Sequence, residues 1–148
     1  MGVLKGVCIS REKQGRAKNI HQCEVGQRGM SGDARYGKGI KQVSILPYET
    51  VKQYFDEKNE PVDYGRFGEN LVVEGLKLEN IKPGDKYFSG DVVLEVTQIG
   101  SQWEGMDEYQ GERVCYPMGK SFIFCKVLHT GILTEDEGFS EYKLNNKK

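Results

Sequence analysis

The sequence has 148 residues, of which 37% are hydrophobic and 29% charged, and its formal net charge is -1. This length and composition predict one globular domain over residues 1–148 and exclude a disordered chain. With 21 basic and 22 acidic residues, the chain has no overall attraction to nucleic acid or to an anionic membrane, so neither is expected as a partner. No apolar run approaches the roughly 20 residues of a membrane span, and no signal-peptide pattern is present. A cytoplasmic protein of bacterial type is therefore expected.

The first half of the chain predicts short strands, long loops and one helix. Strands are expected at residues 3–10, 21–25 and 41–46, with a basic loop and a long glycine-punctuated loop between them. A helix is expected within residues 47–61, because Pro47 suits a first helical position and the apolar residues at 51, 54 and 55 fall on one face.

The second half predicts further short strands. One is expected at 70–76, and others lie around two turns at 83–85 and 89–91. A polar loop with little periodicity covers 101–120, and 121–133 is a last long strand or a hairpin. Because strands do not alternate with helices, an antiparallel barrel or sandwich is expected in place of a parallel sheet.

The turn "YGRFGEN" (64–70) is the first candidate site. Gly65 and Gly68 would let backbone N–H groups face an anion, as in anion-binding nests. Arg66 would add a bidentate contact to phosphate or carboxylate, and Asn70 both donates and accepts hydrogen bonds. The alternative is a glycine loop ordered by Asn70 capping its own backbone, with no ligand. Glu69, inside the turn, has no obvious partner.

The glycine-rich loop over residues 28–44 is the second candidate site. Its cations and one hydroxyl would bind an anionic small molecule; the alternative is a solvated basic loop. Asp33, within the loop, has no obvious partner. The groups concerned are Arg28, Arg35, Lys38, Lys41 and Ser44.

Among the four cysteines, Cys115 is the candidate reactive thiol. It lies two residues after Arg113 and five before Lys120, in a loop, and neighbouring cations favour the thiolate. Cys8 and Cys125 lie in apolar strands, where buried packing is expected.

The sequence has no recognisable catalytic or zinc motif. Cys23 is two residues from His21, and Cys125 is four from His129, but neither pair forms the double cluster of a zinc site. The motifs of serine hydrolases, zinc proteases and P-loop NTPases are also missing.

Five segments, in order, resemble the MOSC domain, which occurs at the C-terminus of molybdenum-cofactor sulfurases and as small stand-alone bacterial proteins. "GRFGENLVVEGL" resembles the family's signature, and "GMSGDARYGKGIKQVSIL" resembles its Gly-Asp loop and the basic strand that follows. "VCISREKQGRAK", "IKPGDKYFSGDVVLEVTQIG" and "CYPMGKSFIFCKVLHTGIL" resemble its opening strand, late central strand and final strands. The resemblance covers residues 3–137.

The resemblance implies a mainly β fold, a strongly curved antiparallel or mixed β-barrel with one or two short helices, which binds molybdenum cofactor in a cleft. It implies that Asn70 is the ligand contact of the turn and that Lys41 and Ser44 belong to the basic strand's contribution. Arg66 and Arg35 complete the expected cofactor-binding set. The resemblance also implies, at the level of the family, pyridoxal phosphate binding.

Two departures from the family pattern concern the metal. Trp103 stands where relatives usually have a cysteine, and Arg35 stands where many have histidine. Cys115 is the family-like cysteine that remains, so it is the expected metal ligand and the expected catalytic residue.

The sequence thus predicts a protein that binds or transfers molybdenum cofactor or its sulfur. Possible partners are molybdoenzymes or cofactor-biosynthesis proteins. Two alternatives stay open. One is an enzyme, a molybdenum reductase or sulfur transferase that works through Cys115. The other is an interaction module that has lost the ligand.

Overall fold

The computed structural model describes residues 2–11, 17–37, 39–100, 107–109, 112–114, 118 and 120–142. Within these residues it contains thirteen strands, one α-helix and one short 3-10 helix. For residues 107–109 and 112–114 it describes the backbone alone. No helix in these ranges is both long enough and apolar enough to cross a membrane.

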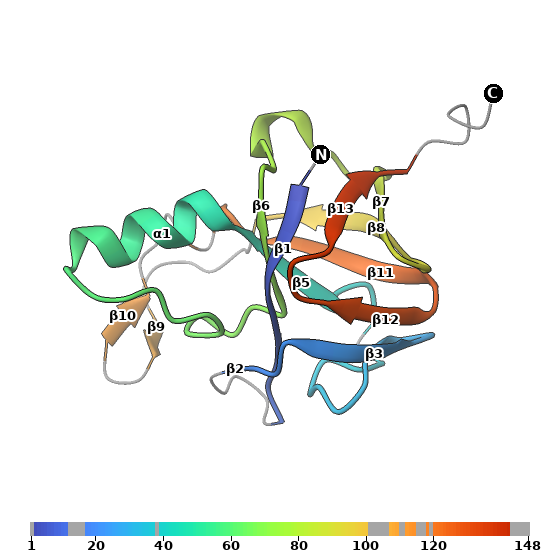
Figure 1. Ribbon diagram of the computed structural model, residues 1–148, viewed down its shortest axis with the longest axis horizontal. Helices are drawn as coiled ribbons and strands as arrows, with labels where there is room; N and C mark the ends of the chain where they lie inside the picture. The colour runs from blue at the N-terminus through green and yellow to red at the C-terminus, as the bar shows by residue number, and fades with distance from the viewer. Residues whose placement is uncertain are drawn as a thin grey trace.

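Seven strands close into a barrel (Figure 1). In order of pairing they are β13 (Gly138–Glu141), β7 (Lys86–Ser89), β8 (Val92–Ile99), β11 (Ile123–His129), β5 (Val43–Pro47), β6 (Leu71–Glu74) and β1 (Gly2–Ile9). The ring is closed by β13 and β1, which pair Gly2 with Phe139. The β5–β6 pair is parallel and every other pair in the ring is antiparallel, so the barrel is mixed.

The remaining strands are short. Those outside the barrel ring are β2 (Lys18–Asn19), β3 (Gln22–Gly26), β4 (Gly29–Met30), β9 (Asp107–Tyr109), β10 (Glu112–Val114) and β12 (Gly131–Thr134). β12, β3 and β4 form a three-stranded sheet, β9 and β10 form a hairpin, and β2 extends the edge of β1. The 3-10 helix η1 (Leu78–Asn80) lies between β6 and β7.

Two separate apolar cores lie on the two faces of the central strands. In β11, Ile123 and Cys125 belong to the core that fills the barrel, whereas Phe124 belongs to a second core outside it. This division follows from the two-residue period of a strand, which sends neighbouring side chains to opposite faces. Because both faces are covered, β5 is buried along its whole length. The barrel interior is therefore packed with side chains, and the second core lies on the outer face of the central strands.

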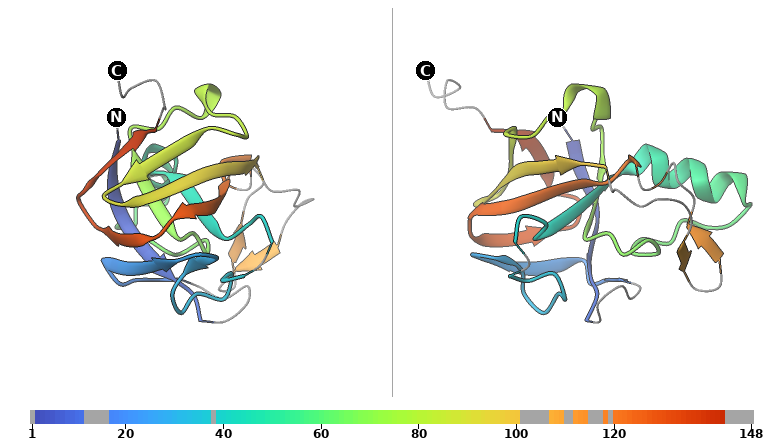
Figure 2. Two further views of the ribbon diagram at one scale, coloured as in Figure 1. Left: turned by 90° about the vertical axis from the view of Figure 1, so that its right-hand side faces the viewer. Right: turned by 180° about the vertical axis from the view of Figure 1, so that it is seen from behind.

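The helix α1 (Tyr48–Glu57) covers this second core. Its buried residues are Val51 and Phe55, one turn apart. Phe55 packs on Phe67 at 6.0 Å between ring centres. We call this outer group the aromatic core; its buried members are Leu46, Val51, Phe55, Phe67, Val72, Met118, Phe122 and Phe124. Figures 1 and 2 show α1 and the β9–β10 hairpin on the same side of the barrel.

The predicted fold class is confirmed, with differences in detail. Pro47 is the last residue of β5 and caps the helix, which begins one residue later than predicted. Segment 121–133 contains two strands that do not form a hairpin, because β12 pairs with β3. Strand β13, which closes the barrel, was not predicted. Only Phe139 in it is buried, so the segment carries no alternating apolar pattern.

Candidate functional site

The turn over residues 64–70 binds an anion that belongs to the protein itself. The buried Glu69 carboxylate accepts hydrogen bonds from the backbone N–H of Gly65, at 2.7 Å, and of Phe67, at 3.0 Å. Backbone N–H groups gathered in this way form a cavity that suits a negative charge. The backbone of this turn is therefore arranged around an anion. That anion is the carboxylate of Glu69, which accepts from the N–H groups of residues 65 and 67.

Gly65 makes this turn possible. Its φ is +92°, a conformation that side-chain-bearing residues rarely adopt. An added Cβ would lie 2.3 Å from the carbonyl oxygen of Ala17. The same two segments are joined by a hydrogen bond from Ala17 N to Gly65 O, at 3.0 Å. The glycine thus allows the turn to pack directly against the chain that precedes β2.

Asn70, which follows the turn, is completely buried and joins three other segments. Its side-chain oxygen accepts from the backbone N–H of Ser44 at 2.9 Å and from the Ser44 hydroxyl at 3.2 Å. Its amide nitrogen donates to the carbonyl of Cys8, at 3.1 Å, and to the carboxylate of Asp33, at 3.0 Å. The structure therefore brings Asn70 and Ser44 together, as contacts that hold the fold of the site.

Asp33 connects this network to the glycine-rich loop. Besides the Asn70 amide, its carboxylate accepts from the backbone N–H of Ser10 at 2.8 Å and of Arg35 at 2.9 Å. The side chain is 7% exposed, and a buried carboxylate requires such donors. The two candidate segments of the sequence, the turn and the loop, are thus joined through the contact between Asp33 and Asn70.

Two of the predicted cations, Arg35 and Lys41, lie over one aromatic ring. The Arg35 Cζ is 5.8 Å and the Lys41 Nζ 5.0 Å from the ring centre of Phe124, within the range of cation–π attraction. Phe124 stacks on Phe122 at 5.6 Å between ring centres. Burial lowers the pKa of Arg35, and the charge of Asp33 opposes this shift. Arginine nevertheless stays protonated in proteins.

Neither of these cations has a carboxylate within ion-pair distance among the residues that the structure describes. Lys41 is exposed and Arg35 is half-buried. Positive charges gathered on a ring and outside ion-pair distance of any described carboxylate attract an external anion, although the charge of Asp33 also acts on Arg35. Phosphate and carboxylate suit arginine in particular, because its guanidinium forms paired hydrogen bonds to two oxygens.

Arg66 lies in a different setting. Its guanidinium nitrogen is 3.5 Å from the Glu60 carboxylate and 4.0 Å from that of Asp63, and its Cζ lies 5.6 Å from the ring centre of Phe55. The side chain is only 15% exposed. These contacts fix the turn to the segment after α1, so part of the charge of Arg66 is neutralised within the protein.

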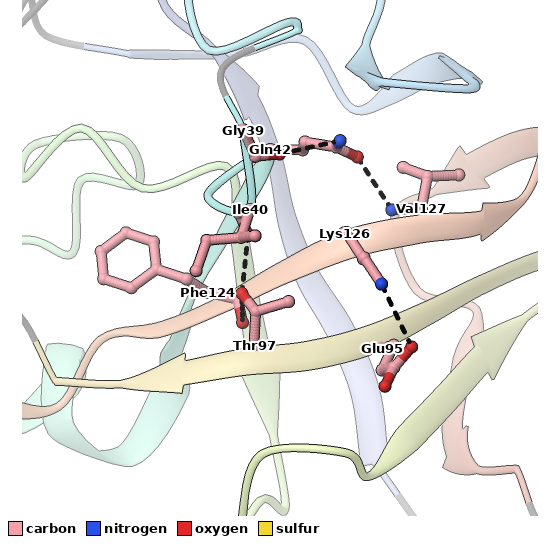
Figure 3. A network of polar contacts seen from close by, with 8 residues as sticks. All are labelled: Gly39, Ile40, Gln42, Glu95, Thr97, Phe124, Lys126 and Val127. Atoms are coloured by element: carbon pink, nitrogen blue, oxygen red, sulfur yellow. Dashed lines mark hydrogen bonds and ion pairs between the residues drawn. The ribbon is translucent and has the colours of Figure 1, made fainter.

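The segment that carries Lys41 is attached to the barrel through Gln42 (Figure 3). The Gln42 side chain donates to the carbonyl of Gly39 at 3.0 Å and accepts from the backbone N–H of Val127 at 3.0 Å. Its own backbone N–H donates to the carbonyl of Cys125 at 3.1 Å. Lys41 is therefore followed directly by a residue fixed to β11.

Cys115, the predicted metal ligand and catalytic residue, lies outside the described residues. The other three cysteines, Cys8, Cys23 and Cys125, are free and buried. Burial raises the pKa of each of these thiols, most strongly for Cys8 and Cys125. They are therefore protonated near neutral pH and do not provide the thiolate that a soft metal requires.

The described residues contain no group of three or more His, Cys, Asp or Glu side chains placed to hold a metal ion. A shallow surface depression runs along the outer face of α1, and none of the predicted site residues lines it. Its lining residues are Tyr48, Glu49, Lys52, Gln53, Asp56 and Glu57.

Phe124 was not among the site residues predicted from the sequence. A signal was present, because Phe122 and Phe124 alternate with the apolar Ile123 and Cys125, the pattern of a strand buried on both faces. Nothing local, however, indicated that cations from a loop some 80 residues earlier would lie on this ring. The role of Glu69 was also missed, although an acid that directly follows a glycine turn is placed to accept from the backbone N–H groups of that turn.

Comparison with known proteins finds a family model that matches part of the chain. Residues 32–100 match the family model described as MOSC domain, and five of the six predicted site residues lie within this range. An uncharacterized protein, YflK, from Bacillus subtilis strain 168 is 31% identical over 70 residues, which are 47% of this chain and 32% of YflK. The match thus covers about a third of the length of that relative.

Solved structures share the fold. The crystal structure of the YUAD protein from Bacillus subtilis has a TM-score of 0.70 at 17% identity and covers 97% of this chain and 98% of its own. YiiM from Geobacillus stearothermophilus has a TM-score of 0.63 at 19% identity and covers 96% and 73%. YiiM from Escherichia coli has a TM-score of 0.63 at 18% identity and covers 97% and 70%. At these identities the likeness concerns the fold alone. The resemblance predicted from the sequence motifs is confirmed by this match of residues 32–100 to the MOSC domain model.

Proposed function

We propose that this protein binds molybdenum cofactor, and that Arg35 and Lys41 hold its phosphate. MOSC domains are associated with the biology of this cofactor. The observation that carries the proposal is the pair of cations over Phe124, which have no carboxylate partner in the described part of the chain.

The donors fit the anionic part of the cofactor. A phosphate takes charge-assisted hydrogen bonds from guanidinium and ammonium groups, and these bonds are roughly twice as strong as neutral ones. The aromatic ring beneath the cations limits their access to water on one side and orients them. When bound, the cofactor would supply a molybdenum held by dithiolene sulfur, while the chain supplies the groups that grip the phosphate.

The other predicted residues take supporting roles in this proposal. Asn70 and Ser44 position the site, because their hydrogen bonds are made within the protein and Asn70 fixes Asp33, which in turn holds the backbone of Arg35. Arg66 holds the glycine turn against the residues after α1.

Cys115 is proposed as the thiolate that contacts the metal or carries sulfur. The chain has four cysteines, and the three that the structure describes are buried with raised pKa values. A thiolate contributed by this chain would therefore come from Cys115. If the bound cofactor needs this ligand, Cys115→Ser will retain the phosphate site but hold molybdenum less tightly.

The test is retention of the cofactor by purified protein. Protein is mixed anaerobically with cofactor released from a molybdoenzyme and desalted, and molybdenum is measured by mass spectrometry. Loss of one charge-assisted hydrogen bond of about 1.5–3 kcal/mol weakens binding by roughly 10- to 150-fold. We expect Arg35→Ala and Lys41→Ala each to show a loss of this order.

Lys58→Ala is the matched control, because Lys58 also lies over a ring, 5.3 Å from the ring centre of Tyr54, but belongs to the end of α1. It should retain as much molybdenum as the unaltered protein. Absence of any retention by the unaltered protein would contradict the proposed function. Equal retention by Lys41→Ala and Lys58→Ala would contradict the assignment of the phosphate site.

A further inference from the structure

Strand β8 contains an irregularity beside the cation-bearing ring. Its pairing with β11 joins Gln98 to Phe124 and then Val96 to Cys125. Thr97, between them, has no opposite residue on β11 and is the extra residue of a β-bulge. The alternation of buried and half-buried residues along β8 is regular up to Thr97 and is lost from Gln98 on. Bulges of this kind redirect a side chain and occur often next to functional sites.

The redirected hydroxyl of Thr97 joins the two parts of the candidate anion site (Figure 3). Its Oγ1 lies 2.6 Å from the carbonyl oxygen of Ile40, the residue before Lys41. It also lies 3.2 Å from the carbonyl oxygen of Phe124, the residue whose ring lies beneath the cation. A hydroxyl has one proton to donate, and the shorter contact makes Ile40 its main acceptor.

The bond matters because the loop has few other attachments at this point. Ile40 is 53% exposed, so its side chain does little to hold the backbone in place. On the other side of Lys41, Gln42 is fixed to β11. Before Lys41, the described loop is held by the Thr97 bond to Ile40 and by the bond from the Gln42 side chain to the carbonyl of Gly39. Of these two bonds, only the one from Thr97 ties the residue next to Lys41 directly to β8.

We propose that Thr97 is a positioning residue, which sets the Lys41 ammonium over Phe124 by holding the carbonyl of Ile40. This inference rests on the proposed function, in which Lys41 binds the anion. It adds that the bulge in β8 places the Thr97 hydroxyl against Ile40 and in this way orients the Lys41 ammonium. Loss of the hydroxyl is expected to leave the fold intact and to let the ammonium leave the ring, so that anion binding weakens.

The test uses inorganic phosphate as the probe, with dissociation constants measured by NMR titration at low ionic strength. Thr97→Val keeps the shape of the side chain and removes the donor. A hydrogen bond of ordinary net strength corresponds to an increase of about three- to tenfold in the dissociation constant. Thr97→Ser keeps the hydroxyl and should restore binding to within about twofold.

A double-mutant cycle separates positioning from a general structural effect. If Thr97 acts through Lys41, Thr97→Val will weaken phosphate binding in the unaltered protein and have no effect in Lys41→Met. Unchanged binding by Thr97→Val, or an equal loss in both backgrounds, would overturn the positioning role. If Lys41→Met itself binds phosphate as tightly as the unaltered protein, the anion site of the proposed function fails, and the role of Thr97 fails with it. Thermal melting of each variant checks the fold.

Discussion

Replacement of Asn70 by alanine tests the claim that this residue holds the site together. Asn70 is completely buried and makes four side-chain hydrogen bonds, two with Ser44 and one each with Cys8 and Asp33. Asn70→Ala removes all four while leaving the surrounding polar groups in place. Because these groups are buried, water cannot readily replace the amide.

The expected loss of stability is large. A hydrogen bond contributes about 0.5–1.5 kcal/mol net, so four of them correspond to about 2–6 kcal/mol. A domain of this size is stable by about 5–15 kcal/mol in all, so the variant will approach the limit of folding.

Urea unfolding followed by circular dichroism measures this change. The exposed Asn80, at the end of η1, provides the control, since Asn80→Ala should change the free energy of unfolding by no more than about 0.5 kcal/mol. A loss below about 1 kcal/mol for Asn70→Ala would refute the reasoning, because the four bonds would then not be holding three segments together.

Further predictions concern the glycine turn and the thiols. In urea unfolding, Gly65→Ala should destabilise the protein far more than Gly84→Ala. Both glycines have positive φ, but only an added Cβ at 65 meets another backbone, that of Ala17. Equal effects would show that the close approach is unimportant. Glu69→Gln should lower the free energy of unfolding by about 1–3 kcal/mol, because the new amide nitrogen would face a backbone N–H donor. Unchanged stability would argue against the internal anion. With iodoacetamide at pH 8, Cys115 should be alkylated before the other three cysteines, whose pKa values burial raises; equally slow labelling of all four would count against a thiolate there.

Features of the fold that depend on local pattern were accessible from the sequence. The helix was found because its apolar residues repeat with helical spacing, and its buried side chains, Val51 and Phe55, are among those predicted to share a face. Strand β13 was not found, because pairing with β1 stabilises it and a single buried aromatic leaves no pattern. Tertiary pairing decided the structure where local preference was weak.

The candidate site shows the same division. Five of the six predicted residues lie within the segment that matches the MOSC domain, but their contacts could not be predicted individually. Asn70 meets Asp33 across 37 residues, and Arg66 pairs with the carboxylates of Glu60 and Asp63, which were not among the predicted site residues. The sequence supplied a set of candidate residues. Only the structure separates the cations that remain open to a ligand, Arg35 and Lys41, from the one that is engaged internally.

The most direct test of this account is where an anion binds. Protein labelled with ¹⁵N is titrated with inorganic phosphate, and backbone amide shifts are followed in two-dimensional NMR spectra. We expect saturable shifts centred on Arg35, Lys41 and Phe124, with the turn at 64–70 unaffected because Glu69 occupies its N–H groups. Shifts centred on that turn, or no saturable shifts at all, would contradict the account.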